Sequence, residues 1–519
     1  MSAREVRRLM VTRHEVALLD VREEGAYAQA HPLLAASLPV SQLELQILDR
    51  VPRCSTTIVV YDDDGRLSLR AQEILRRLGY SDVRTLCGGL EGWRQTGYQL
   101  FQDVNSASKA FGELVEARRD TPSIPPQELR RLLDSGDNVV VLDSRRFDEF
   151  QTMTIPSAVS TPGAELVLRA TSLAPDPATR IIVNCAGRTR SIIGAQSLLN
   201  AGLHGRVAAL RDGAIGWSLA GLDLEHGAAR RSDSTPLQET DAMRRRAREV
   251  AYRAGVRHID VETLDFLRGD PIRTTYCFDV RQPAEFETRH ASGFRNAPGG
   301  QLVQETDVSA PVRGARIVLH DPLGARADMT ASWLAQMGWD TYVLDDLAPC
   351  EATGPDRPQL PPLPQHGLIA ADALAEKLSA QTVQVLDLGP SPERARAHIP
   401  GSWFVIRSMM AEALQALGPP KPLVLCSPDG VLAAFAAPEV EALTGAAPMV
   451  LQGGLAAWRA RGLPVEAGLG DLLSPTTDVY KRPYEGVGNG HAAMRAYIDW
   501  EHGLVEQLAR DASHGFVVI

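Results

Sequence analysis

Residues 181–191 read IIVNCAGRTRS, an apolar run that leads through one cysteine, Cys185, into a short basic loop. The run 181–184 is typical of a buried strand, and residues from about 191 to 200 have the spacing of a helix that stops at Gly202. A buried strand followed by a loop and a helix is the building unit of an open, mainly parallel α/β sheet. Functional groups in such sheets lie at the carboxyl ends of the strands, which is where we expect Cys185.

The same unit recurs four times along the chain. Each copy has a first apolar run that ends in an aspartate, namely Asp20, Asp143, Asp279 or Asp387. A second apolar run follows at residues 58–61, 181–184, 317–320 and 423–426. The residues directly after it are Asp62, Cys185, Asp321 and Ser427, which lie 42 residues after the aspartate in three copies and 40 after it in the fourth. These four residues therefore occupy one equivalent position, and only one of them is a cysteine.

Two further signals appear in the same order. The residues eleven positions after the aspartate are His31, Thr154, His290 and His398. Three copies end in a glycine turn and a tryptophan, at residues 88–93, 212–217 and 453–458, whereas the third copy lacks this ending at 345–347. The repeated order predicts an α/β protein of four tandem modules, each a mainly parallel open sheet flanked by helices.

We expect the modules at residues 1–103, 121–227, 256–350 and 366–469, followed by a helical tail at 470–519. Helices over 106–119 and 241–254 are predicted to connect modules, and a proline-rich segment at 354–365 precedes the fourth. The tail contains an amphipathic helix whose apolar side comprises Met494, Tyr497, Ile498, Leu504, Val505 and Leu508. It is expected to dock on its own chain or across a homodimer.

The composition is that of a globular chain, with 519 residues of which 44% are hydrophobic. The net charge of −10 argues against nucleic-acid or membrane partners, because no large basic surface remains to neutralise phosphates. Residues 1–11 lack the apolar core of a signal peptide, and no stretch is long and apolar enough for a membrane span. The six cysteines have no CxxC spacing, so we predict neither disulfides nor a metal site and expect a cytoplasmic location.

The loop after Cys185 has the features of an anion cradle. Backbone N–H groups of a strand-to-helix loop turn inward, and the start of the helix adds a partial positive charge. Arg188 and Arg190 add two full charges. We expect these groups to lower the pKa of Cys185 and favour the nucleophilic thiolate. The other cysteines are interpreted as structural, including Cys426, because Ser427 occupies the nucleophile position in that copy.

The repeated unit resembles the rhodanese module, and the chain resembles the multidomain bacterial rhodanese-type sulfurtransferases. The resemblance covers about residues 1–470 and rests on the strand ending in aspartate, the segment like His-Ile-Pro-Gly, the Cys185 loop and the glycine–tryptophan ending. It implies that Cys185 takes the outer sulfur of thiosulfate as a persulfide and passes it to cyanide or a thiol. The residues implied to bind this small anionic donor, without a cofactor, are Ala186, Gly187, Arg188, Thr189 and Arg190. It also implies that the copies carrying Asp62, Asp321 and Ser427 are inactive.

Loop size separates this chemistry from that of the rhodanese-like phosphatases, which share the fold. Their Cys-x5-Arg loop would require an arginine at position 191, but this chain has Ser191 there and its arginine one position earlier. Two other interpretations stay open: a 3-mercaptopyruvate donor, and a persulfide carrier or scaffold that does not turn over. The two loop arginines favour thiosulfate, because mercaptopyruvate-type loops tend to be less charged.

Overall fold

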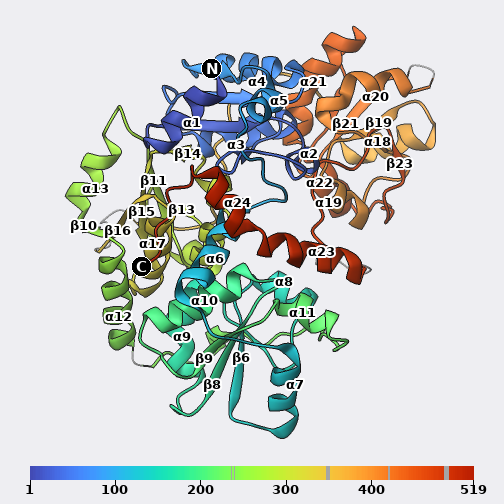
Figure 1. The fold of residues 1–519 in the computed structure, drawn as a ribbon. Coiled ribbons are helices and arrows are strands. Elements are labelled where there is room, and N and C mark those ends of the chain that lie inside the picture. The colour runs from blue at the N-terminus through green and yellow to red at the C-terminus, as the bar shows by residue number, and fades with distance from the viewer. Residues whose placement is uncertain (235, 239, 346–350, 419–420, 484, 486–489) are drawn as a thin grey trace.

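The computed structural model describes residues 1–234, 236–238, 240–345, 351–418, 421–483, 485 and 490–519. Figure 1 shows four α/β bodies arranged around a centre that contains helix α6 (Ser106–Arg119) and the C-terminal helices. The predicted connecting helix over 106–119 is therefore confirmed. Within the described residues, no helix combines the length and apolarity needed to cross a membrane.

The second body has a five-stranded parallel sheet with the order β5-β9-β8-β6-β7. Its strands are β5 (Ser123–Ile124), β6 (Val139–Asp143), β7 (Val159–Ser160), β8 (Arg180–Asn184) and β9 (Val207–Leu210). Its helices are α7 (Pro126–Ser135), α8 (Phe147–Thr152), α9 (Leu166–Leu173), α10 (Thr189–Asn200) and α11 (Gly213–Leu219), with a 3-10 turn η2 (Gly163–Glu165). The central strands β6 and β8 carry Leu142, Ile181 and Val183 into a core that is closed to solvent.

The third body repeats this strand order as β10-β16-β15-β11-β13. Its parallel strands are β10 (Arg257–Ile259), β11 (Thr275–Asp279), β13 (Arg295–Asn296), β15 (Arg316–His320) and β16 (Asp340–Leu344). Its helices are α12 (Thr240–Arg253), α13 (Val261–Arg268), α14 (Pro283–Thr288), α15 (Gly299–Gln304), α16 (Thr306–Ser309) and α17 (Ala325–Gln336). A separate antiparallel pair joins β12 (His290–Ala291) to β17 (Glu351–Ala352). The predicted loss of the glycine–tryptophan ending at 345–347 falls mostly outside the described residues.

The fourth body uses the order β18-β22-β21-β19-β20-β23, again parallel. Its strands are β18 (Gly367–Ile369), β19 (Gln384–Asp387), β20 (Trp403–Phe404), β21 (Leu423–Cys426), β22 (Met449–Leu451) and β23 (Asp471–Leu472). Its helices are α18 (Ala371–Ser379), α19 (Ser391–Arg396), α20 (Met410–Ala416), α21 (Val431–Thr444) and α22 (Gly454–Ala460), with η4 (Arg407–Met409).

The first body differs at one edge. Its parallel strands are β1 (Val16–Asp20), β2 (Ala36–Ser37), β3 (Ile58–Tyr61) and β4 (Val83–Thr85). Its helices are α1 (Ala3–Val11), α2 (Glu24–Tyr27), α3 (Leu43–Arg50), α4 (Arg66–Arg77) and α5 (Gly89–Gln95), with a 3-10 turn η1 (Val40–Gln42). Strand β14 (Val312–Arg313), which precedes β15 in the chain, pairs antiparallel with the start of β1. The first and third bodies therefore share a sheet edge, which the repeat pattern does not reveal. The predicted fold of several parallel-sheet modules is confirmed, while the residue limits of the modules stay predictions.

The C-terminal tail docks on its own chain as two helices, α23 (His491–His502) and α24 (Leu504–Asp511), which meet at Gly503. Tyr497, Ile498, Leu504 and Leu508 are buried, as the amphipathic pattern predicted. The single predicted helix is wrong in this detail, because the break at Gly503 lets the two helices cover different surfaces. Figure 1 shows α24 beside α6 and α23 reaching over the second body near α8 and α11.

Buried ion pairs join the bodies. Arg407 of η4 binds Glu44 of α3 with both nitrogens, at 2.8 and 2.9 Å, and binds Glu439 of α21 at 2.7 Å. The Arg407 side chain is 1% exposed and that of Glu44 is 3% exposed. This pairing links the first body to the fourth through charges that have little access to water.

We expect Arg407→Leu to destabilise this junction by about 3–5 kcal/mol, because it removes the buried cation that binds both Glu44 and Glu439. Denaturant unfolding of the full chain should show a lower midpoint. Arg66→Leu is the matched control, since the Arg66–Glu412 pair joins the same bodies but both side chains are 59% exposed. Its effect should stay below about 1 kcal/mol, and equal losses in both variants would contradict this account.

Candidate active site

Cys185 directly follows β8 at the carboxyl edge of the second sheet, as the sequence predicted. Its Sγ lies 3.5 Å from the Ser191 hydroxyl, which donates a hydrogen bond to the Arg188 carbonyl at 2.8 Å. Helix α10 begins at Thr189, two residues before the predicted start. The loop between strand and helix is therefore short and places Cys185 close to the first turn of the helix.

The glycine–tryptophan ending holds this loop in shape. The N–H groups of Ala214 and Ile215, in the first turn of α11, donate to the carbonyls of Cys185 and Ala186, both at 2.9 Å. Gly213 has φ of +54°, and a Cβ at this position would lie 2.5 Å from the Cys185 oxygen and 2.6 Å from the Gly187 oxygen. Only glycine permits this close approach. Because the loop carbonyls point toward α11, the loop N–H groups are free to face the other way.

Equivalent loops in other copies show what such a geometry binds. In the first body the Asp62 carboxylate accepts hydrogen bonds from the N–H groups of Gly65 at 2.9 Å and Leu67 at 2.8 Å, and from the Ser68 hydroxyl at 2.6 Å. Ser68 lies six residues after Asp62, as Ser191 does after Cys185. The loop is therefore an anion cradle, and in the first body the chain fills it with its own carboxylate.

Below the loop, Asp143 ties the strand end together. Its carboxylate accepts from Arg145 Nε at 2.9 Å, from the Thr154 hydroxyl at 2.8 Å and from the Asn184 amide at 2.8 Å. All four residues are buried. This network fixes Asn184, the residue before Cys185.

The two loop arginines are bound by acidic side chains. Arg188 forms ion pairs with Glu113 at 2.8 Å, with Asp212 at 2.9 Å and with Glu116. Arg190 pairs with Glu149 at 2.8 Å. Burial tends to raise the pKa of Glu149, but the ion pair with Arg190 outweighs it and holds that pKa at about 2. The positive charge that the sequence places beside Cys185 is therefore largely compensated by carboxylates.

The expectation of a lowered Cys185 pKa is wrong for this arrangement. Cys185 is 2% exposed, and its burial raises the pKa of the thiol although Arg190 and Ser191 act in the opposite direction. Desolvation disfavours the thiolate, and cations already paired with carboxylates compensate for it only in part. The sequence contained both arginines but gave no sign of their acidic partners.

Three elements outside the second body complete the site. A cavity of about 20 Å³ beside Cys185 is lined by the loop and also by Lys109 of α6, Gln304 of α15, and Tyr497 and Glu501 of α23. The apolar spacing of the tail indicated that it docks, but nothing in the sequence indicated that it docks here. Glu501 and Lys109 come from regions 76 residues or more from Cys185, so only the assembled structure brings them together with it.

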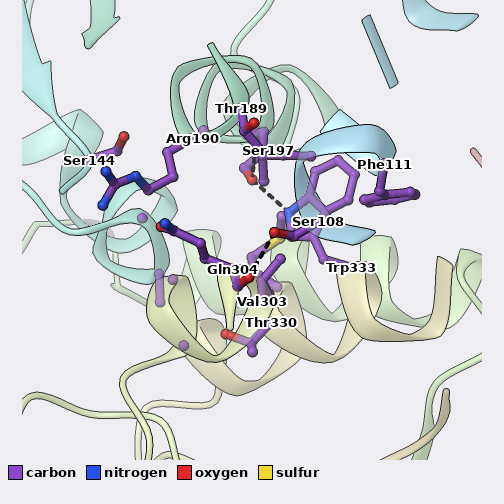
Figure 2. Close-up of a pocket in the computed structure, with 17 residues that line it drawn as sticks. Ser108, Phe111, Ser144, Thr189, Arg190, Ser197, Val303, Gln304, Thr330 and Trp333 are labelled. Carbon is purple, nitrogen blue, oxygen red and sulfur yellow. Dashed lines mark hydrogen bonds between the residues drawn. The ribbon is translucent and has the colours of Figure 1, made fainter. Parts of the chain in front are cut away.

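A second, mainly apolar cavity of about 40 Å³ lies next to the site, between α10, α15 and α17. Figure 2 shows Thr189 and Arg190 on one side of it and Gln304, Val303 and Thr330 on the other. Its edge is fixed by the Trp333 indole, which donates to Ser197 at 2.9 Å, and by Ser108, which donates to the Gln304 carbonyl at 2.7 Å. Gln304 thus lies between this cavity and Cys185.

Comparison with known proteins places these observations in a family. The model of the rhodanese-like domain matches residues 2–96, 125–220 and 370–461. The chain belongs to the rhodanese-like domain family. The third body is not matched by that model, but it has the same strand order as the second rhodanese-like module.

Individual relatives agree with this assignment. A crystal structure of thiosulfate sulfurtransferase from Pseudomonas aeruginosa is 54% identical, with a TM-score of 0.97, and covers 100% of this chain and 99% of that one. Thiosulfate sulfurtransferase PspE from Escherichia coli is 37% identical over 73 residues, which are 14% of this chain and 69% of that protein. Centrosomal protein of 41 kDa from Bos taurus is 29% identical over 119 residues, 21% of this chain, but these span only 32% of that protein.

The site contains no evident metal ligands. In the parts of the chain that the structure describes, no three His, Cys, Asp or Glu side chains are grouped so that they could hold a metal ion. The described cysteines other than Cys185 are Cys54 and Cys87, which are exposed, and Cys277 and Cys426, which are buried. Cys350 lies outside the described residues.

We expect Gly213→Ala to distort the Cys185 loop, because its Cβ would overlap two loop carbonyls. Thiosulfate sulfurtransferase activity should fall at least about tenfold, which corresponds to about 1.4 kcal/mol of lost transition-state stabilisation. The matched control is Gly221→Ala: Gly221 also has positive φ, +74°, but a Cβ there meets nothing within 4 Å. Gly221→Ala should have the same unfavourable backbone conformation but keep its activity, and similar losses in both variants would contradict the role given to Gly213.

Proposed function

We propose that this rhodanese-like protein is a thiosulfate sulfurtransferase in which Cys185 carries the sulfur. The observation that supports the proposal most directly is the equivalent position of Asp62, Cys185, Asp321 and Ser427, where one module alone offers a thiol. The likeness to two thiosulfate sulfurtransferases supports the choice of donor. The loop that binds a carboxylate in the first module supports an anionic sulfur species in the second.

The reaction has two half-steps that balance without an oxidant. The Cys185 thiolate attacks the outer sulfur of thiosulfate, a bond forms from Sγ to that sulfur, and the sulfur–sulfur bond of thiosulfate breaks as sulfite leaves with the electron pair. Cyanide or a thiolate then attacks the outer sulfur of the persulfide. The bond from Sγ breaks, and its electron pair returns to Cys185 as the thiolate.

The loop residues Ala186, Gly187, Arg188, Thr189 and Arg190 line the cavity with Cys185 and are proposed to bind the donor. Backbone N–H groups of the loop and the start of α10 attract the anion. Arg188 and Arg190 fix the conformation of the loop as well as adding positive charge to it, because each forms an ion pair with a carboxylate. Tyr497 and Glu501 of α23 line the same cavity, so the donor would bind between the loop and this helix.

Purified protein should turn over thiosulfate with cyanide, and Cys185→Ser should lower the rate by at least about 1,000-fold because it removes the nucleophile. Mass spectrometry after thiosulfate treatment should find one added sulfur atom on the Cys185 peptide. Cys426→Ser is the matched control: Cys426 is buried at the end of the equivalent strand β21, and this change should leave turnover within about twofold. Persisting activity in Cys185→Ser would refute the proposal, and loading without repeated turnover would identify a carrier instead.

A further inference from the structure

The C-terminal helix α23 places one acid, Glu501, against the Cys185 loop. Glu501 is 1% exposed, and its Oε2 faces the loop so closely that a Cβ added to Gly187 would lie 3.1 Å from it. The apolar contacts of Tyr497 and Ile498 with Ala186 and Ile215 hold the helix in this place. The acid therefore belongs to the wall of the site.

The two oxygens of Glu501 have different surroundings. Oε1 accepts a hydrogen bond from the Tyr497 hydroxyl at 3.0 Å. Oε2 is buried and has no hydrogen-bond partner among the described residues. Glu501 is one of the residues that line the cavity beside Cys185. Buried polar atoms are rarely left unpaired, so an unpaired oxygen next to a nucleophile points to a ligand or intermediate that pairs with it.

Gln304 provides a second buried, unpaired oxygen on the opposite side of the cavity. It is 7% exposed, its Oε1 is likewise buried without a described partner, and it lines the same cavity. Its amide group can donate as well as accept. Two polar side chains from different parts of the chain thus converge on one small space beside the sulfur.

The space beside Cys185 is narrow. Its volume of about 20 Å³ is close to what one water molecule needs. The outer sulfur of a persulfide is a single atom of comparable size. The narrow part of the site therefore suits a persulfide sulfur held between the loop and α23.

We propose that Glu501 is a catalytic residue of the Cys185 site, which holds the transferable sulfur by donating a hydrogen bond from its protonated carboxyl to the outer persulfide sulfur. The inference rests on the proposed function, because it needs a persulfide on Cys185. Since Oε1 accepts from Tyr497, we assign the carboxyl proton to Oε2, which is the oxygen that lies against Gly187 of the loop. The proton stays on Glu501 throughout, and no bond of the carboxyl is made or broken.

The protonation state that this role needs is consistent with the surroundings. Burial raises the pKa of Glu501 to about 8, and nearby Glu113 also raises it. Lys109 and Arg188 lower it, but Lys109 is bound to Asp103 at 2.7 Å and Arg188 to its own carboxylates. The titratable and charged groups facing Glu501 are Lys109 and Glu113 from α6, Cys185 and Arg188 from the loop, and Tyr497 from its own helix. Below a pH of about 8 the carboxyl is a donor, and above it a carboxylate that repels the persulfide anion.

The test measures how long the persulfide survives. The full-length protein is loaded with thiosulfate, freed of excess donor, and the mass of the Cys185 peptide is followed without acceptor between pH 6 and 10. In the wild type we expect the lifetime to shorten as the pH rises through about 8. Glu501→Gln keeps a donor at the same place and cannot ionise, so its lifetime should match the wild type at pH 7 and lose the decline at higher pH. Glu501→Leu has no donor and should shorten the lifetime at pH 7 at least about tenfold.

Two controls separate this role from tail docking. Glu506→Gln changes an exposed acid of the neighbouring helix α24, whose side chain is 86% exposed, and should behave as the wild type. Limited proteolysis of each variant reports whether α23 remains docked. If α23 is undocked in Glu501→Leu, the pH dependence of Glu501→Gln alone decides the test. A Glu501→Gln lifetime that declines with pH as in the wild type would overturn the inference. Failure of the wild type to load any sulfur would overturn the proposed function itself.

Discussion

The hydrogen bonds between the Cys185 loop and the start of α11 are the constraint on which the site depends. Two loop carbonyls accept N–H groups of that helix, and Gly213 allows the two segments to approach. The same contact recurs in the first and fourth copies, where Leu90 donates to the Asp62 carbonyl at 3.2 Å and Leu455 to that of Ser427 at 3.0 Å. The glycine turn and the loop equivalent to that of Cys185 therefore form one structural unit in these three copies, which explains why they are repeated together.

That unit provides a cradle without specifying what occupies it. In the first module the Asp62 carboxylate occupies the cradle and accepts three hydrogen bonds, so these donors are satisfied by the chain itself. In the third, Asp321 pairs with Arg326 at 3.0 Å, and Arg326 also binds Glu165 of the second module at 2.8 Å. There the position equivalent to Cys185 has become part of a module interface. The loop of the third module thereby contributes to assembly around the second one.

Assembly also determines the chemistry of the second module. Packing of α6 and α23 on the loop buries Cys185, and α6 brings Glu113 and Glu116 to Arg188. The low dielectric of the resulting site strengthens each remaining polar contact, but it penalises any charge that lacks a partner. The sulfur of Cys185 in this buried site therefore depends on neutral hydrogen-bond donors as much as on cations for its stabilisation. The C-terminal tail therefore contributes directly to the surroundings of Cys185.

The sequence by itself determined the four-fold repeat, the strands and the position of Cys185. Apolar runs of four or five residues ending at a fixed spacing are local patterns, and β3, β8, β15 and β21 form where those patterns lie. It also predicted the helix over 106–119 and a docked tail. These features follow from local periodicity, which a single chain displays without any knowledge of its partners.

Only the tertiary structure decided the electrostatics and the closure of the site. The partners of Arg188 and Arg190 come from α6 and α8, and the acid above the sulfur comes from a helix more than 300 residues along the chain. The expected low pKa of Cys185 is not found, mainly because burial disfavours the thiolate, and Arg190, itself paired with Glu149, offsets this only in part. Burial and charge pairing depend on which surfaces meet in space, and spacing along the sequence carries no record of that.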